Sequence, residues 1–286
     1  MRGLQEFDQC LEARGVTREH RERTVGYVRI FGEPFTPERA EANVVQWRQE
    51  GRSARSINAR LTALRAFSRF LYRRRFAKTD ALLDVTPVNG AVDRRRIRRA
   101  LTHAEFDALV ATCPPKRRLV YLVAAYTGLR SGELTRLTRG DVFLDAPARI
   151  VVRAKSAKGR REESVPLPAW LANELSRVAL SLEPSDRVLR VPARAAAALA
   201  NDLRAAGVTL DDGSGRVVDF HALRVTFITW HALAGTPLTV TQQLARHRDP
   251  KLTANVYTAL GLADLEKATA ALPAPTSPPD ASPAKQ

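Results

Sequence analysis

One short stretch, from Asp219 to Tyr257, collects side chains that could act on a phosphate ester. His221 and Arg224 stand three residues apart, His247 follows, and Tyr257 ends the stretch. A histidine can serve as a general base, an arginine fork can neutralise two phosphate oxygens, and a tyrosine hydroxyl can act as a nucleophile. These residue types therefore predict attack on a phosphodiester without a metal ion or another cofactor.

The charge of the chain points to a polyanionic partner. The net charge is +16 and the pI is near 10.8. Residues 51–100 hold fourteen Lys and Arg against three acidic residues, a net charge of +11, and most of these cations are arginines. Arginine suits phosphate because its planar fork engages two oxygens. A solvated face in a chain rich in arginine is the alternative interpretation.

The sequence gives no sign of a membrane segment or of a secreted protein. No apolar run approaches the roughly 20 residues that span a bilayer, and the first residues lack the apolar core of a signal peptide. Cys10 and Cys113 lie far apart and form no metal-binding spacing. We expect a soluble, cytoplasmic protein without a disulfide framework or a zinc site, in which both cysteines are small buried or half-buried residues.

The first third of the chain predicts a small helical domain. Apolar residues recur at helical spacing over 18–31 and 37–50, and most clearly over 56–72. In this third helix Ile57, Leu61 and Leu64 share one apolar face. Arginines lie elsewhere around it, which is typical of a helix that faces DNA. The predicted DNA-binding residues of this helix are Arg55, Arg60, Arg65, Arg69 and Arg73.

A break in structure separates this domain from the next. The run 86–91 is rich in turn residues, and a basic segment follows over 93–99. We expect a helical domain over 1–90, a linker over 91–99, a second domain over 100–272 and a disordered Pro-rich tail over 273–286. The linker cations predicted to contact phosphate, with a merely solvated segment as the alternative, are Arg94, Arg95, Arg96, Arg98 and Arg99.

The second domain is predicted to be mostly helical with a small sheet. Thr102 and Glu105 have the spacing of a capping box, and a buried helix is expected over 119–126. Two β-like runs, 149–153 and 163–167, indicate a hairpin whose loop carries Lys155 and Lys158. Further helices are expected over 169–180, 192–206, 221–234, 239–246 and 251–260.

Five short motifs, in order, resemble those of the tyrosine recombinase (phage integrase) family in its compact two-domain form, like the Xer recombinases. Thr127-Gly-Leu-Arg130-Ser-Gly-Glu133 matches the first box, and His221-Ala-Leu-Arg224 matches the His-x-x-Arg box. Leu244-Ala-Arg-His247 matches the later histidine, and Tyr257 falls at the nucleophile. Counting eight residues back from Pro166, as the family's hairpin does, selects Lys158 rather than Lys155.

The resemblance implies the role of each residue. Arg130 and Arg224 would clamp the non-bridging oxygens, with Glu133 as accessory acid and His247 as a further donor. Lys158 would protonate the leaving 5′ oxygen, and His221 would assist as base on Tyr257. The other histidines, His20, His103 and His231, fill no position and are interpreted as structural or surface residues.

The resemblance also implies a fold and a partner. The fold would be mainly α, with an N-terminal helical core-binding (SAM-like) domain followed by a mixed α/β, mostly helical catalytic domain with a small antiparallel sheet. The partner would be double-stranded DNA, bound by a homotetramer of protomers that are monomers in solution. Strand exchange would pass through a 3′-phosphotyrosyl link and a Holliday junction.

Two positions depart from the family pattern. Val225 stands where the His-x-x-Arg box continues with histidine, and Arg246 stands where glycine usually precedes the later histidine. We expect these changes to affect packing and DNA contacts more than chemistry. A telomere resolvase or a type IB topoisomerase-like enzyme is an alternative within the same chemistry. A non-enzymatic helical DNA-binding regulator is the alternative outside it, although a DNA binder has no use for Tyr257 and Lys158.

Overall fold

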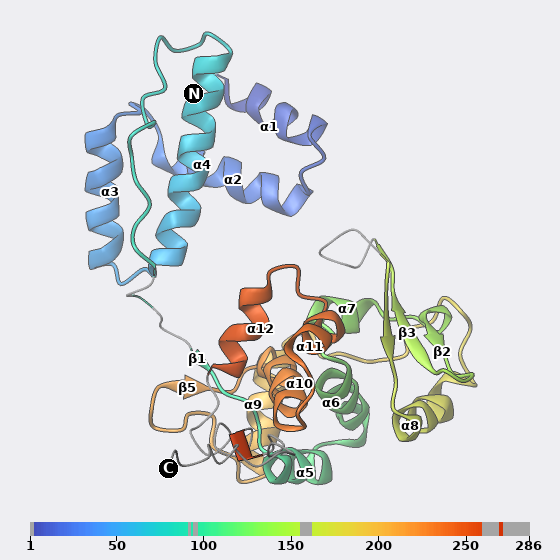
Figure 1. Cartoon of the computed structure of the whole chain (residues 1–286). Helices are drawn as coiled ribbons and strands as arrows, with labels where there is room; N and C mark the ends of the chain where they lie inside the picture. Colours follow the sequence, from blue (N-terminus) through green and yellow to red (C-terminus); the bar gives the residue numbers. More distant parts are fainter. Residues whose placement is uncertain (1–2, 91–92, 94–96, 155–161, 259–268, 271–286) are drawn as a thin grey trace, which may run out of the picture. The chain divides into compact units, whose positions relative to one another are not determined.

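A computed structural model describes residues 3–90, 93, 97–154, 162–258 and 269–270. The contacts divide the chain into two compact units, Met1–Arg95 and Arg96–Gln286 (Figure 1). Each unit has its own hydrophobic core. The domain boundaries expected at residues 90 and 100 stay predictions. The tail over 273–286 lies outside the described residues.

The first unit has four helices within its described residues, 3–90 and 93. The helices predicted over 18–31, 37–50 and 56–72 are confirmed as α2, α3 and α4, whereas α1 was not predicted. Phe7 and Leu11, one turn apart, are buried on α1 and pack into the core. The bounds are Leu4–Ala13 for α1, Arg18–Phe31 for α2, Pro37–Gln49 for α3 and Ala54–Arg73 for α4.

Helix α4 organises this unit. Ser53 caps its start by accepting a hydrogen bond from the Ser56 backbone N–H at 3.2 Å. Ile57, Leu61 and Leu64 are buried on one face, as predicted, and α4 contacts the other three helices. Figure 1 shows α4 in the middle of the unit, between α3 and the pair α1 and α2. Burial of this apolar face is the main force that assembles the unit.

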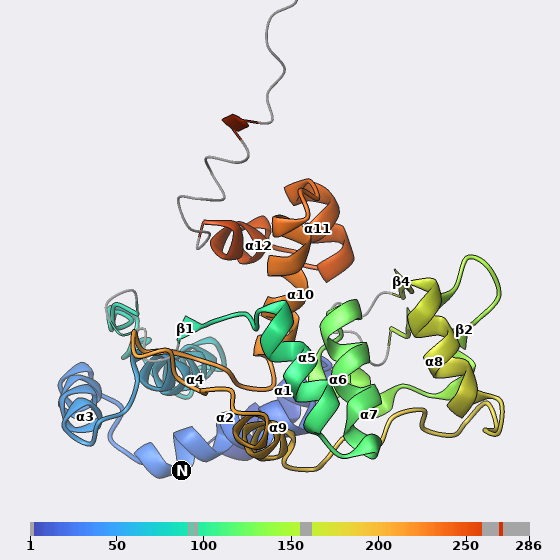
Figure 2. The same cartoon turned by 90° about the horizontal axis from the view of Figure 1, so that it is seen from below.

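The second unit is mostly helical. Helices α6 and α10 pack against each other, and α11 and α12 pack together on α10 (Figures 1 and 2). The helices predicted over 119–126, 169–180, 192–206, 221–234, 239–246 and 251–260 are confirmed to within a few residues as α6 and α8 to α12, whereas α7 was not predicted. The bounds are His103–Thr112 for α5, Pro115–Thr127 for α6, Ser131–Arg136 for α7, Ala169–Ala179 for α8, Ala195–Ala205 for α9, Ala222–Leu233 for α10, Leu238–Ala245 for α11 and Pro250–Tyr257 for α12.

A three-stranded antiparallel sheet accompanies these helices. Its order is β2–β3–β4, with β2 over Val142–Phe143, β3 over Arg149–Val152 and β4 over Glu163–Pro166. Ile150 pairs with Val165, and both are buried. The predicted hairpin is thereby confirmed in its two strands. A second sheet, the parallel pair β1 (Ile97–Arg98) and β5 (Arg216–Val217), was not predicted.

Local sequence explains where two of the helices begin and end. The Thr102 hydroxyl accepts from the Glu105 backbone N–H at 3.2 Å, and the Glu105 carboxylate accepts from Thr102 N–H at 2.9 Å. This is the predicted capping box, at the start of α5. Helix α6 ends at Gly128, whose φ is +60°. A Cβ atom there would lie 2.5 Å from the Phe227 ring, so glycine is required for both conformation and space.

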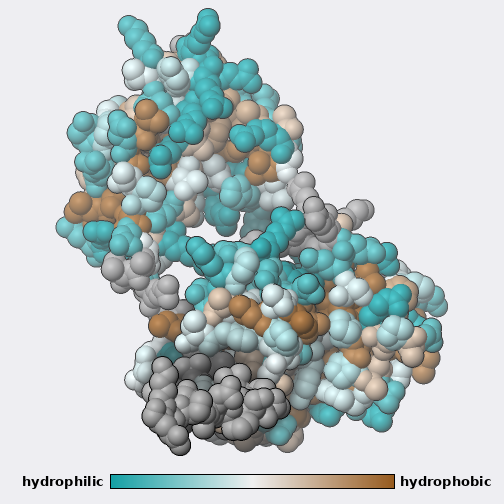
Figure 3. Space-filling model, in the orientation of Figure 1, coloured by the Kyte–Doolittle hydropathy of each residue, from teal (hydrophilic) through white to brown (hydrophobic). Residues whose placement is uncertain are grey.

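Hydrophilic residues cover much of the face drawn in Figure 3, with smaller hydrophobic patches among them. Within the described residues, no helix is both long and apolar enough to cross a membrane. Cys10 is half-buried and Cys113 is buried, and both thiols are free.

Candidate active site

Arg130 and Glu133 are held together at the start of α7. The Glu133 carboxylate accepts from the Arg130 backbone N–H at 2.8 Å and from Arg130 Nη1 at 2.9 Å. The side chain of Glu133 is 3% exposed and that of Arg130 is 27% exposed. Glu133 therefore fixes the orientation of the Arg130 guanidinium, and part of that guanidinium stays exposed.

Arg224 lies on the first turns of α10 and is almost completely buried. Its Nη1 donates to the Gly128 carbonyl and its Nη2 donates to the Ala245 carbonyl. Burial, together with the positive charges of Arg130 and Arg246, lowers the pKa of Arg224 to about 9, against the opposite effect of Glu133 and Glu163. A guanidinium with this pKa is still protonated at neutral pH. It is a poorly hydrated cation for which an anion would be a favourable neighbour.

His247 follows the end of α11. Its Nδ1 lies 2.9 Å from the Thr253 hydroxyl on α12. Burial, together with the nearby cations Arg224 and Arg130, lowers its pKa to about 4. His247 is therefore neutral at neutral pH. If Thr253 donates to Nδ1, the ring proton is on Nε2 and is available to a ligand.

His221 precedes α10 and is exposed. Partial desolvation lowers its pKa, as do the positive charges of Arg98 and Arg224, against an opposite effect of Asp219. The Asp219 carboxylate accepts from Arg98 Nε at 2.8 and 2.9 Å and is within 2.8 Å of Arg98 Nη2. His221 is thus kept in its neutral form, which can accept a proton.

These side chains meet in one pocket of about 420 Å³. Its walls come from α7, β4, α10 and the segment from Arg246 into α12. Four of the predicted catalytic residues line it: Arg130, His221, Arg224 and His247. Glu133 lies behind Arg130, within hydrogen-bond distance. The pocket is therefore rich in cations and hydrogen-bond donors, which suits a phosphate group.

Tyr257 lies at the end of α12, next to this pocket. Its hydroxyl donates to the Thr236 carbonyl at 2.8 Å and lies 2.6 Å from the Thr241 hydroxyl. Among the described residues, the pocket lining includes Val256 but not Tyr257. The structure thus brings the tyrosine helix to the site while the hydroxyl is bound on the side of α11.

Lys158, the predicted general acid, lies outside the described residues, as do Lys155 and the rest of 155–161. The strands β3 and β4 that flank this loop are described. Glu163, the first residue of β4, lines the same pocket as Arg130 and Arg224. The described strand β4 therefore begins at the pocket wall.

The arginines predicted to bind DNA include several that already have partners within their own unit. Arg60 stacks on Tyr27 and Trp47, with 5.0 and 5.4 Å to the ring centroids, and Arg69 lies 3.5 Å from Asp80. Arg65 donates to the Leu83 carbonyl at 3.4 Å. Arg55 and Arg73 are exposed. A role of any of these five in binding DNA stays a prediction.

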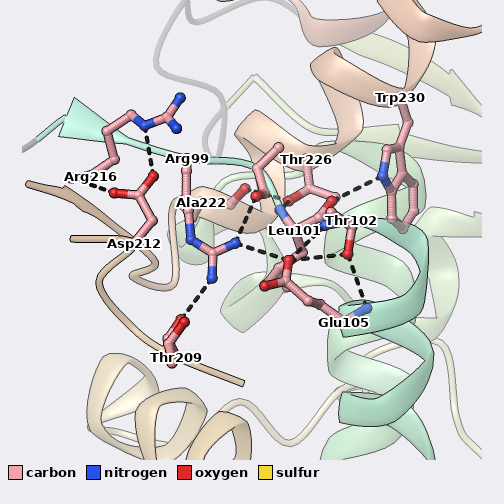
Figure 4. Close-up of polar contacts among 11 residues, drawn as sticks. Arg99, Leu101, Thr102, Glu105, Thr209, Asp212, Arg216, Ala222, Thr226 and Trp230 are labelled. Carbon is pink, nitrogen blue, oxygen red and sulfur yellow. Dashed lines mark hydrogen bonds and ion pairs between the residues drawn. The ribbon is translucent and has the colours of Figure 1, made fainter. Parts of the chain in front are cut away.

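The two linker arginines that the structure describes also have partners within the protein. Arg98 pairs with Asp219. Figure 4 shows Arg99, which donates to Glu105 at 2.9 Å and to the Thr209 carbonyl at 2.7 Å. These bonds anchor the start of the second unit. A contact of Arg98 or Arg99 with phosphate stays a prediction. The remaining linker residues, Arg94, Arg95 and Arg96, lie outside the described residues.

Arg246 was expected to affect packing and DNA contacts, yet its guanidinium lies in the site. Its Nη2 donates to Glu133 Oε2 at 2.6 Å. Its Nε lies 3.4 Å from Glu163 Oε2. The other departure, Val225, also lines the pocket. An arginine directly before His247 was the sequence feature that could have indicated this role. Its contact with Glu133 joins residues 113 positions apart, so it could not be predicted without the fold.

The chain matches known proteins over most of its length. Residues 99–262 match the model of the phage integrase family. The tyrosine recombinase XerA of Thermococcus kodakarensis is 28% identical over 274 residues, which cover 93% of each chain. The tyrosine recombinase XerC of Haemophilus ducreyi is 28% identical over 250 residues, covering 79% of this chain and 77% of that one.

Solved structures share the fold. A lambda integrase dimer bound to a COC′ core site matches with a TM-score of 0.70 at 18% identity, over 89% of this chain and 75% of that one. The Tn1549 transposon integrase in complex with a circular intermediate DNA matches with a TM-score of 0.68 at 16% identity, over 94% and 99%. The mainly α fold with a small antiparallel sheet is thereby confirmed.

Proposed function

This chain belongs to the phage integrase family, and on that premise we propose that it is a site-specific DNA recombinase. It would cut and rejoin double-stranded DNA through a tyrosine. The two relatives described above are tyrosine recombinases, and the two solved structures described above were determined with DNA. A telomere resolvase, a type IB topoisomerase or a non-enzymatic regulator is not favoured by any of these likenesses.

The observation that carries this proposal is the meeting of Arg130, Arg224 and His247 in one pocket beside the helix of Tyr257. The three residues come from different elements. Burying the charged guanidinium of Arg224 costs desolvation free energy, which an uncharged side chain in a purely structural role would avoid. A phosphodiester has the charge and the acceptor geometry that two guanidinium groups and an imidazole N–H would satisfy.

The reaction follows from these groups. Tyr257 attacks the phosphorus atom, the 5′ oxygen leaves, and a 3′-phosphotyrosyl link forms beside a free 5′ hydroxyl. His221 takes the tyrosine proton, and Lys158 gives a proton to the 5′ oxygen. Arg130 and Arg224 stabilise the charge that grows on the non-bridging oxygens, with His247 as a further donor. The phosphate exchanges its ester bond to the 5′ oxygen for an ester bond to Tyr257 and remains a diester. Rejoining the strand therefore needs no nucleotide cofactor.

Glu133 and Thr253 position the groups that touch the phosphate. Glu133 orients Arg130, and Thr253 fixes the tautomer of His247 that carries its proton on Nε2. Tyr257 must leave its bonds to Thr236 and Thr241 to reach the phosphate. The described arrangement therefore corresponds to a state before attack.

The wider assembly extends the same proposal. The first unit would be the core-binding domain over 1–90, joined by the basic segment 91–99 to a catalytic domain over 100–272. Four protomers, monomers in solution, would assemble on two DNA sites and exchange strands through a Holliday junction. DNA as the substrate favours the cytoplasm as its location.

Covalent capture tests this function. The protein is incubated with sheared, lightly nicked genomic DNA of the organism that encodes it, because a nick lets the 5′ end of a cut strand diffuse away and traps the adduct. Strands that remain attached after denaturation are sequenced. We expect one recurrent sequence with the protein at a 3′ end, and no capture by Tyr257→Phe. DNA binding without capture would contradict the proposal and favour a regulator.

A second experiment separates a recombinase from a topoisomerase. A plasmid with two copies of the captured sequence and a plasmid with none are treated with the protein. A recombinase produces deletion or inversion in the first and leaves the second supercoiled. Relaxation of both plasmids without rearrangement would contradict the proposal.

A further inference from the structure

The backbone at Arg246 has a conformation that favours glycine. Its φ is +54° and its ψ is +44°, and it caps the end of α11. Among the described residues, Arg75 is the one other non-glycine residue with positive φ. An L-residue in this region costs about 1 kcal/mol or more relative to the right-handed form. Arginine therefore occupies this position although glycine would adopt the same backbone conformation at a lower free-energy cost.

The side chain of Arg246 is 3% exposed and lies between two carboxylates. Nη2 donates to Glu133 Oε2 at 2.6 Å, and Nε lies 3.4 Å from Glu163 Oε2. Nη1 is also buried and has no hydrogen-bond partner among the described residues. Burial lowers the pKa of Arg246, against the opposite effect of Glu133. A cation is thus buried at the centre of the site, against a cost that its two acidic neighbours offset.

Glu133 is shared between two guanidinium groups. Its Oε1 accepts from Arg130 Nη1 at 2.9 Å, while its Oε2 accepts from Arg246 Nη2 and from the Arg130 backbone N–H. Because both oxygens are occupied in fixed directions, the carboxylate cannot rotate to take a second bond from the Arg130 side chain. The guanidinium of Arg130 is thereby held in one orientation, with its exposed part left for a ligand.

The backbone of the same turn contacts both arginines of the site. The Arg246 carbonyl accepts from Arg130 Nη2 at 3.3 Å, and the adjacent Ala245 carbonyl accepts from Arg224 Nη2. These carbonyls are available because α11 ends here and the left-handed residue turns the chain. One turn therefore sets the positions of Arg130 and Arg224 through its backbone and that of Glu133 through its side chain.

We infer that Arg246 is a positioning residue of the reaction, which locks Glu133 and thereby orients Arg130 toward the scissile phosphate. The inference rests on the proposed function and adds a third guanidinium to its machinery. Arg246 acts through Glu133 rather than on the phosphate, because its Nη2 donates to Glu133, whereas its Nε and Nη1 are buried and have no hydrogen-bond partner among the described residues, Nε having Glu163 only as an ion-pair neighbour at 3.4 Å.

Two variants of Arg246 test the inference. Arg246→Gly removes the guanidinium and relieves the backbone, and Arg246→Met removes the charge while it keeps most of the side-chain volume. Arg75→Gly is the matched control, because it also removes an arginine at positive φ, from an exposed position in the first unit. The rate of covalent adduct formation is measured at saturating concentrations of the captured DNA, nicked for trapping, and the Kd is measured separately.

Both Arg246 variants should form adduct about 10- to 100-fold more slowly, with little change in Kd, because misplacing a catalytic group by a fraction of an ångström costs rate rather than binding. The urea midpoint of Arg246→Gly should show that the variant is folded, and Arg75→Gly should react as the unchanged protein does. If either Arg246 variant reacts at the unchanged rate, the guanidinium is not required and the inference is wrong.

A DNA with sulfur at the bridging 5′ position distinguishes the arginine site from the lysine loop. A thiolate leaves without a proton, so a defect in the general acid is bypassed. The defect of Arg246→Gly should persist with this DNA. Its recovery would place the effect on the leaving group, by way of Glu163 and the hairpin, and would overturn the inference. A lack of adduct with the unchanged protein would instead overturn the proposed function itself.

Discussion

The hydroxyl of Tyr257 lies 2.6 Å from the hydroxyl of Thr241, sixteen residues earlier on α11. Tyr257 donates its own proton to the Thr236 carbonyl at 2.8 Å, so Thr241 is the donor to Tyr257. The tyrosine is therefore satisfied in both directions by protein groups outside the pocket that holds Arg130 and Arg224. A nucleophile that is bound in this way must break two hydrogen bonds before it can attack.

Releasing Tyr257 should speed the reaction. Thr241→Val keeps the volume of a fully buried side chain but removes the donor to Tyr257. One such bond contributes about 1 kcal/mol, so adduct formation should rise by up to about fivefold. The rate with nicked DNA is compared with that of Thr135→Val, which removes an exposed helix hydroxyl that bonds to the Ser131 carbonyl and not to the tyrosine. A slower reaction of Thr241→Val would contradict this account of Tyr257.

Lys158 rather than Lys155 should supply the leaving-group proton. Lys158→Ala should lower adduct formation by about 100-fold or more with natural DNA, which is the usual size of a general-acid effect. A DNA with a bridging 5′ sulfur should restore the rate. Lys155→Ala, the control from the same loop, should react within a few-fold of the unchanged protein. The reverse pattern would show that the spacing from Pro166 selects the wrong lysine.

His247 should make the fold sensitive to acid. Its pKa in the folded protein is about 4, lowered by burial and by the nearby cations Arg224 and Arg130, whereas the unfolded value is near 6.5. Between these values the unfolded chain binds more protons, so the free energy of unfolding falls as the pH falls through this window. His247→Gln should therefore lose less stability than the unchanged protein between neutral pH and about pH 5. Equal losses in urea midpoint would contradict the lowered pKa.

The buried carboxylate of Asp202 should matter for stability and not for chemistry. It accepts from Arg117 Nε at 2.6 Å, from Arg117 Nη2 at 2.7 Å and from the Tyr121 hydroxyl at 2.6 Å. Burial acts to raise its pKa, but the bonds from Arg117 and Tyr121 together lower it. Asp202→Asn should reduce the free energy of unfolding by about 1–3 kcal/mol in urea titrations, because a buried ion pair is broken.

The exposed pair of Arg18 and Glu22 gives the matched control for Asp202. Both side chains are more than half exposed, and their ion pair joins adjacent turns of α2. Glu22→Gln should leave the urea midpoint unchanged. A loss as large as that of Asp202→Asn would contradict the view that burial makes the difference.

Much of the fold and most of the pocket could be predicted from local sequence. The arginine helix α4, the hairpin β3–β4 and the capping box at Thr102 follow from periodicity and spacing, which act over a few residues. Helices α1 and α7 and the two-residue strands β1, β2 and β5 were not predicted, because such short segments carry little periodic signal.

The details that decide reactivity depend on contacts between distant positions. The sequence gives Arg130, Glu133 and Arg246 as separate residues, but the packing of α7 on α6, of α6 on α10 and of α10 on α11 brings Arg246 to Glu133. The position of the Tyr257 hydroxyl likewise depends on Thr236 and Thr241, whose residue types suggest no such role. Arg98 and Arg99 were predicted from charge alone, and acidic partners elsewhere in the second unit bind both.

The central claim is that Tyr257 becomes joined to a 3′ phosphate of DNA. The captured adduct is digested with nuclease and with protease, and the peptide that carries a nucleotide is sequenced by mass spectrometry. We expect one modified peptide, from the end of α12, with the nucleotide on Tyr257 through its 3′ phosphate and a free 5′ hydroxyl on the other strand end. A nucleotide on any other residue, or a 5′-phosphate linkage, would contradict it.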